Sequence, residues 1–214
     1  ETGKMSADNI VLLTFTERAT IEAKEKILNI IGSKGSDIVV STFHGFCHSI
    51  LREFGPSEIT DWVLWQDSDI IHYFIDHFDE LDELSSRTFK TDPVVAITTA
   101  FIPFFSRLKD ELITPEYLEK YYAPKEWSRE WVSDNFPALH AGTNKEEAAL
   151  QLQDLIQVYH WFQSVKAREK ALDFGDMLLH CYTLLHGNPV VLKKVQNRYR
   201  HFFIDEYQDN NFAL

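Results

Sequence analysis

Residues His201–Asp209 read HFFIDEYQD: a short apolar run ends in an Asp-Glu pair, and a Gln and a second Asp follow closely. An apolar run of this kind is typical of a buried parallel strand. Open α/β sheets bind their ligands outside the carboxyl ends of such strands. The segment therefore predicts an α/β fold with a polar site where this strand ends.

The Asp205-Glu206 pair at the end of this strand has two interpretations. In nucleoside triphosphatases, an Asp in this place holds the magnesium ion while a neighbouring group positions the attacking water. The alternative is a pair of strand-end acids that face the solvent. Gln208 and Asp209 favour the first interpretation, because the combination DExQD is rare by chance.

The chain upstream alternates between strand and helix patterns as far as Gly55. Short apolar runs predict strands at residues 10–13 and 37–40. Apolar residues at helical spacing follow each run, and Gly55-Pro56 closes the second of these helices. This alternation is typical of a parallel sheet.

Beyond Pro56 the pattern becomes almost entirely helical. The expected helices cover residues 67–84, 93–108, 114–122, 145–170, 174–185 and 189–199. Pro103 is expected to kink or break the second of them, because proline removes a helical hydrogen bond. Residues 123–144 are expected to form a loop. The sequence therefore predicts a helical block that interrupts an α/β sheet.

Three more strings stand out: LTFTERA at Leu13–Ala19, STFHGF at Ser41–Phe46 and LDFGDMLL at Leu172–Leu179. Together with the DEYQD box they resemble, in order and character, four motifs of the UvrD/Rep group of superfamily 1 DNA helicases. That family carries an LTFTNKAA-like motif Ia, a GTFHxxxxxxLR-like segment, a DFxDLL segment and a VDEFQD-like motif II. On these four matches the chain is identified as a member of that family.

The resemblance implies an α/β fold: a partial RecA-like parallel sheet of the P-loop NTPase type, interrupted by a mainly α-helical insertion domain. Residues 1–55 would form the N-terminal part of the first RecA-like domain, called 1A. Residues 56–198 would form the helical insertion, called 1B. Residues 199–214 would return to domain 1A with motif II.

A phosphate-binding loop, G-x-x-x-x-G-K-[ST], should precede motif Ia in this family. Gly3-Lys4-Met5 matches the end of that loop only superficially, since Met5 occupies the Ser/Thr place. We therefore expect the loop to lie upstream of residue 1 and the second RecA-like domain to lie beyond Leu214. By themselves, these residues would then bind ATP poorly and unwind nothing.

By the same resemblance, Asp205 would hold Mg²⁺, Glu206 would activate the attacking water and Gln208 would sense the γ-phosphate. The implied cofactors are ATP and Mg²⁺. Such chemistry needs both carboxylates at the end of a rigid strand, so that metal and water meet the γ-phosphate. Tyr207 replaces the family's usual Phe, which is a conservative change.

The resemblance also assigns contacts with single-stranded DNA to two strings, namely to Thr14, Phe15 and Thr16 and to Thr42, Phe43 and His44. Stacking on an aromatic ring contributes about 1–3 kcal/mol per base and ignores base identity, as a translocating motor requires. From the residues alone, a buried core position is the favoured interpretation of Phe15, and His44 is a candidate structural histidine. Glu17 and Arg18 stand where the family often has Asn-Lys, and we assign no DNA role to Glu17.

The net charge of −12 argues at first sight against a protein that binds nucleic acid. Much of the excess acid lies between Asp67 and Asp92, however, and a helicase grips only a few phosphates. Two cysteines suit a reducing cytosol, and no apolar run approaches the roughly 20 residues that cross a bilayer. We therefore expect a cytoplasmic protein without a membrane partner.

These observations together favour an ATP-dependent DNA helicase that moves 3′ to 5′ along single-stranded DNA in repair or recombination. Its expected partners are single strands, single-strand/duplex junctions, and repair or recombination proteins. One alternative is the motor portion of a RecB/AddA-like helicase–nuclease, of which Glu17 in TFTE is reminiscent. The other is a DNA-binding or partner-docking module without motor activity of its own.

Overall fold

The computed structural model describes residues 6–81, 83–121 and 145–214. The phosphate-loop-like residues Gly3-Lys4-Met5 and the expected loop at residues 123–144 lie outside this described part. The chain divides into two compact units. The first unit comprises Glu1–Asp61 and Asp176–Leu214, and the second comprises Trp62–Gly175.

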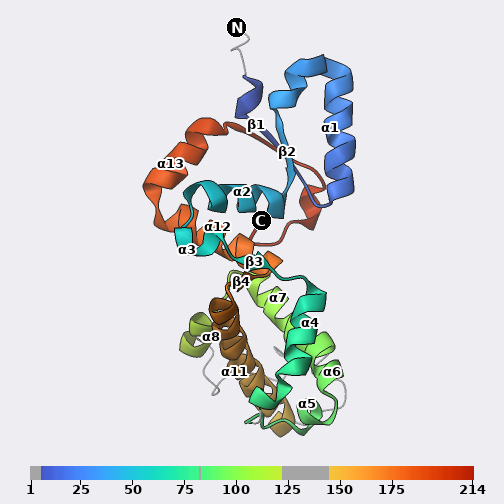
Figure 1. Ribbon diagram of the computed structural model, residues 1–214, viewed down its shortest axis with the longest axis vertical. Coiled ribbons are helices and arrows are strands. Elements are labelled where there is room, and N and C mark those ends of the chain that lie inside the picture. The colour runs from blue at the N-terminus through green and yellow to red at the C-terminus, as the bar shows by residue number, and fades with distance from the viewer. Residues whose placement is uncertain (1–5, 82, 122–144) are drawn as a thin grey trace. The chain divides into compact units, whose positions relative to one another are not determined.

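The first unit is built on a three-stranded parallel sheet, which confirms the predicted α/β class (Figure 1). Its strands are β1 (Ile10–Thr14), β2 (Val39–Thr42) and β5 (His201–Ile204), in the order β2-β1-β5. In the register of the central strand, Leu13 lies opposite Ser41 on one side and Ile204 on the other. The three strands therefore end at the same edge of the sheet.

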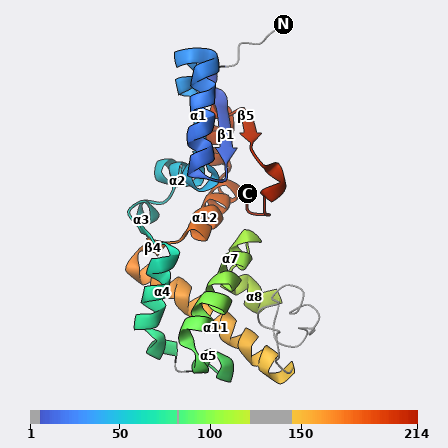
Figure 2. The same ribbon diagram turned by 90° about the vertical axis from the view of Figure 1, so that its right-hand side faces the viewer.

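Helices connect and accompany these strands, and α1 runs alongside β1 in Figure 2. The longer ones are α1 (Glu17–Ile31), α2 (Phe43–Phe54), α12 (Phe174–Gly187) and α13 (Pro189–Arg198). Among the residues described from Ser6 onward, this unit also has the short helical segments α3 (Ser57–Thr60), η1 (Ala7–Asn9), η2 (Gly32–Asp37) and η5 (Tyr207–Asp209). Gly32 ends α1 as expected, with a φ of 65° that favours glycine.

In its described residues, 62–81, 83–121 and 145–175, the second unit is helical apart from one pair of two-residue strands. These are β3 (Val63–Leu64) and β4 (Ala171–Leu172), which lie parallel. Its longer helices are α4 (Asp67–Asp76), α7 (Ile102–Asp110) and α11 (Lys145–Glu169). The remaining segments are η3 (Phe78–Leu81), α5 (Arg87–Thr91), α6 (Pro93–Val95), η4 (Ala96–Phe101) and α8 (Pro115–Tyr121). None of the helices in the described part of the chain is long and apolar enough to cross a membrane.

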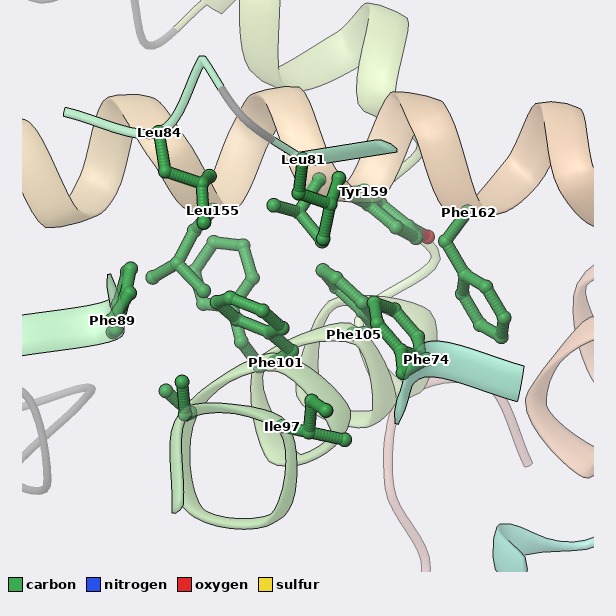
Figure 3. Close-up of a cluster of buried hydrophobic side chains, with 14 of the residues drawn as sticks. Phe74, Leu81, Leu84, Phe89, Ile97, Phe101, Phe105, Leu155, Tyr159 and Phe162 are labelled. Atoms are coloured by element: carbon green, nitrogen blue, oxygen red, sulfur yellow. The ribbon is translucent and has the colours of Figure 1, made fainter. Parts of the chain in front are cut away.

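Aromatic side chains fill the core of the second unit (Figure 3). The ring of Phe105 stacks on Tyr159 of α11 at 4.9 Å between centroids, and Phe74 of α4 lies 5.1 Å from Phe162. Each fully buried side chain of this size contributes about 1.5–3 kcal/mol relative to an exposed one. The cluster thus joins α4, η4, α7 and α11 into one body.

Two helices of the second unit differ from the predicted pattern. The helix expected at residues 67–84 ends at Asp76, and the 3₁₀ segment η3 follows it. Pro103 does not break its helix: α6, η4 and α7 follow one another without interruption from Pro93 to Asp110. The π-helical segment η4 ends directly before the proline, and the Ile102 N–H donates to the Ile97 carbonyl.

The compact units also divide at different residues from those expected. The changes of unit fall after Asp61 and Gly175, whereas the sequence placed them after residues 55 and 198. The reason is that α12 and α13 pack with the first unit. Cys181 of α12 contacts Cys47 of α2, and the ring of Tyr199 lies 5.3 Å from that of Phe46.

Candidate functional site

The motifs of the first unit meet at the carboxyl edge of its sheet. Thr14 ends β1 and lies opposite Thr42, which ends β2. Asp205 follows β5, and its N–H donates to the Leu13 carbonyl at 2.9 Å. Because β1 is the central strand, all three motifs lie at neighbouring strand ends, where open α/β sheets bind ligands.

The three residues predicted to be catalytic, Asp205, Glu206 and Gln208, are all exposed. Glu206 has a left-handed backbone, with φ 50° and ψ 47°, and the 3₁₀ segment η5 begins at the next residue. This conformation costs a non-glycine residue about 1–2 kcal/mol, and such strain concentrates at functional sites. The Gln208 amide donates to the Glu206 carboxylate, so these two side chains are held together.

The acidic pair offers oxygen donors of the kind that a hard divalent cation takes. Carboxylate oxygens are ligands that Mg²⁺ prefers, and Mg²⁺ usually takes only one or two of them beside water and phosphate oxygens. Within the described ranges, no group of three or more His, Cys, Asp and Glu side chains is arranged to hold a metal ion.

The first predicted DNA-binding string forms the turn between β1 and α1. Thr14 is only 1% exposed, and its hydroxyl lies 2.6 Å from the Thr20 hydroxyl and 3.2 Å from the Thr16 carbonyl. Thr16 is exposed and caps α1 by accepting a hydrogen bond from the Ala19 N–H at 3.1 Å. Thr14 thus fixes the turn from inside while Thr16 lies on its surface.

The second string forms the corresponding turn between β2 and α2. Thr42 is buried and caps α2 by accepting from the Gly45 N–H at 3.1 Å. Phe43 is also buried, and its ring packs against that of Phe15 with 5.2 Å between centroids. Phe15 itself is 36% exposed, and His44 is half-buried.

The structure therefore divides the six predicted DNA contacts into two groups. Phe15, Thr16 and His44 reach the surface, whereas the interior holds the other three, Thr14, Thr42 and Phe43. Direct contact with DNA stays a prediction for all six residues. A threonine directly before a helix is an N-cap signal, and this is the local pattern that could have indicated the capping role of Thr42.

Glu17, to which the sequence analysis assigned no DNA role, contacts one of these threonines. The Thr42 hydroxyl donates to a carboxylate oxygen of Glu17 at 3.4 Å, which links the two strings. The contact depends on the parallel register of β1 and β2, in which Thr14 lies opposite Thr42. No local pattern in the sequence reports a contact between residues 25 positions apart.

The fourth string, at Leu172–Leu179, supplies a buried ionic cluster in the second unit. Asp173 accepts hydrogen bonds from Lys109 and from Lys166, the latter at 2.9 Å. Both lysine side chains are only 2% exposed. Asp173 thus ties together α7 and α11, which carry these two lysines.

The two cysteines form a thiol pair between α2 and α12. Cys47 and Cys181 are both free, and their side chains are hydrogen-bonded to each other. The contact with Cys181, together with burial, raises the pKa of the Cys47 thiol well above its usual value. Cys47 therefore stays protonated, as a packing residue rather than a nucleophile.

Comparison with known proteins gives a consistent result. The family model for the UvrD/REP helicase N-terminal domain matches residues 1–214. The ATP-dependent DNA helicase PcrA of Staphylococcus aureus is 28% identical over 216 residues, which cover 98% of this chain and 24% of that protein. The probable DNA helicase II homolog of Mycoplasma capricolum is 28% identical over 217 residues, or 99% of this chain and 26% of that protein. The chain thus spans about a quarter of the length of these relatives.

Proposed function

The chain belongs to the UvrD/REP helicase N-terminal domain family, and from this we infer that it forms part of an ATP-dependent DNA helicase. The parent protein couples ATP hydrolysis to movement along single-stranded DNA and to unwinding of the duplex. It moves 3′ to 5′ and acts in DNA repair or recombination in the cytoplasm. In this proposal the first unit is part of the RecA-like domain 1A, and the second is the insertion 1B.

The observation that carries the proposal is the meeting of three family motifs at one sheet edge. Motif Ia, the TFH string and the DEYQD box follow three adjacent parallel strands. An edge of this kind brings the groups that bind a nucleotide next to the groups that bind DNA. This proximity is what a motor needs, because hydrolysis at one place must move the strand at the other.

We assign the hydrolytic roles to the exposed end of β5. Asp205 would hold Mg²⁺, which would supply positive charge to neutralise the transferred phosphoryl group. Glu206 orients the attacking water and accepts its proton. Gln208 is hydrogen-bonded to Glu206 and senses the γ-phosphate.

We assign DNA contact to the surface residues of the two turns. Phe15 stacks on a base, supported from behind by Phe43. Thr16 and His44 donate to phosphate oxygens, which positions the strand without reading its sequence. Single strands and single-strand/duplex junctions are the proposed substrates, with repair or recombination proteins as further partners.

Hydrolysis of ATP by the full-length gene product, with and without single-stranded DNA, tests this proposal. Glu206→Gln removes the base but keeps the size of the side chain. We expect a loss of DNA-stimulated turnover of about 10²–10⁴-fold, with DNA binding retained. Glu58→Gln makes the same change on the exposed helix α3 and should leave turnover unaffected.

Duplexes with a 3′ or a 5′ single-stranded tail test the direction in the same preparation. Unwinding from the 3′ tail supports the proposed polarity, and unwinding from the 5′ tail contradicts it. If neither the wild type nor Glu206→Gln hydrolyses ATP, while both bind DNA tightly and in a salt-sensitive way, the motor proposal is wrong. The protein would then be a DNA-binding module.

A further inference from the structure

One carboxylate lies between the starts of two helices at the proposed DNA surface. Glu17 is the first residue of α1, and its side chain accepts a hydrogen bond from Thr42, the residue that caps α2. Helix N-termini carry a partial positive charge and favour anions. The negative group that the structure provides at this place is a side chain of the protein itself.

The Thr42 hydroxyl cannot donate to Glu17 and to an incoming phosphate at the same time. Its hydroxyl oxygen accepts from the Gly45 N–H at 3.1 Å, and its proton is donated to Glu17 at 3.4 Å. A hydroxyl has a single proton to donate. While this proton points at Glu17, it cannot be donated to a phosphate oxygen.

The surroundings of Glu17 allow its carboxylate to move away from the Thr42 hydroxyl. Glu17 is exposed, and 3.4 Å is long for a hydrogen bond to a hydroxyl. The next residue, Arg18, directs its Nε to Glu22 one turn further along α1, at 2.8 Å. Phe15, which carries the proposed stacking contact, precedes Glu17 by two residues in the same turn.

We propose that Glu17 acts as an internal competitor of the DNA phosphate at this turn and thereby lowers the affinity of the motor for single-stranded DNA. A phosphate that approaches the turn displaces the carboxylate from Thr42 and meets its charge nearby. Binding is weakened, and release of the strand during stepping is faster. This inference rests on the proposed DNA-binding function of the same edge.

The test is the affinity of the full-length gene product for a fluorescein-labelled oligothymidylate of 20 nucleotides, measured by anisotropy without nucleotide. Glu17→Gln keeps an oxygen that can accept from Thr42 but removes the charge. At 0.1 M salt we expect its Kd to fall by about threefold to tenfold, the effect of one unit charge near a phosphate in a largely aqueous setting. The advantage should shrink at 0.5 M salt, because screening shortens the range of the repulsion.

A matched control separates this local effect from the change in net charge. Glu25→Gln makes the same substitution on the exposed side of α1, about 12 Å further along the helix axis. That separation exceeds the Debye length at 0.1 M salt, so its Kd should match the wild type. An equal gain in both variants would overturn the competitor role.

A third variant distinguishes competition from a merely structural role. Glu17→Ala removes both the charge and the hydrogen bond. If Glu17 only supports Thr42, Glu17→Gln should match the wild type while Glu17→Ala weakens binding, and the proposal then fails. In that case DNA-stimulated ATP hydrolysis by the wild type still stands, and with it the proposed function. A wild-type protein that binds no DNA at all would overturn both.

Discussion

Asp173 accepts hydrogen bonds from the ammonium groups of Lys109 and Lys166, which are both buried in the second unit. The two ammonium groups also lie near the ring of Phe162, at 5.9 Å and 4.5 Å from its centroid. Charges that leave water must regain their solvation from such partners. Asp173 therefore matters more for stability than an exposed acid does.

The first residue-scale prediction concerns this carboxylate. Asp173→Asn keeps the shape but leaves two buried ammonium groups with one negative charge fewer. We expect the free energy of unfolding of the second unit to fall by about 3 kcal/mol, the typical cost of breaking a buried ion pair. Urea denaturation followed by tryptophan fluorescence measures it, because all five tryptophans of the chain lie between Trp62 and Trp161.

An exposed ion pair of the same unit provides the control. Arg107 and Glu111 lie one turn apart on the same side of α7, with 3.3 Å between their charged groups. Glu111→Gln should cost less than about 1 kcal/mol, because both side chains remain hydrated. Equal losses in the two variants would contradict the special role of Asp173.

Sequence reasoning located Asp173 but could not find its partners. The DFGD string marked the position, whereas Lys109 precedes it by 64 residues. From the sequence, a lysine in a helix is expected to face the solvent. Only the packing of α7 against its neighbours shows that Lys109 is buried. The same limit hid the contact of Glu17 with Thr42. Local motifs predicted which residues belong to the candidate site, whereas only the tertiary contacts show which side chains interact there.

At the scale of elements, Pro103 shows how packing modifies a local rule. Proline lacks an N–H and crowds the carbonyl four residues earlier, so a kink or a break was expected. The π-helical segment η4 instead widens the turn ahead of it, with the Ile102 N–H bonded to the carbonyl of Ile97. Ile97 and Phe101 on this segment are fully buried in the aromatic core. Their burial favours a continuous helix with a bulge over a broken one.

The helix α11 also holds a loop of the second unit through two carboxylates. Asp154 accepts from the Ser85 N–H at 2.8 Å and from the Ser86 N–H at 2.7 Å. Glu147, two turns earlier, accepts from the Ser86 hydroxyl at 2.7 Å and the Thr88 hydroxyl at 3.1 Å. Ser86 is also the N-cap of α5, so the start of that helix depends on α11.

This contact makes the stability of the second unit depend on pH. The hydrogen bond from Ser86 holds the pKa of Glu147 below its usual value of 4.5. The charged form is therefore favoured in the folded state, and its contribution is present above pH 4.5 and is lost as the pH falls through the lowered pKa. Glu147→Gln should lower the melting temperature at pH 7 and flatten its decline between about pH 5 and pH 3. Melting curves at several pH values measure this, and parallel profiles for the two proteins would count against it.

At the scale of the whole molecule, the second unit interrupts the first in the sequence. The chain enters it after Asp61 and leaves it after Gly175. The entering strand β3 and the leaving strand β4 are paired, and the Val63 N–H donates to the Lys170 carbonyl at 2.8 Å. Strands of two residues carry no usable sequence pattern, so the helical block was predictable but its boundaries were not.

The paired ends and the enclosed core predict that residues 62–175 fold as an independent domain. All members of the hydrophobic cluster, from Ile70 to Phe162, lie within this stretch, so its excision removes none of them. We expect the excised polypeptide to unfold cooperatively in urea, at the midpoint that tryptophan fluorescence reports for the intact chain. Asp173→Asn should lower that midpoint equally in both settings, because the ion cluster is internal to the unit. A broad transition with strong binding of a hydrophobic dye would instead show that the unit needs the remainder of the chain to pack.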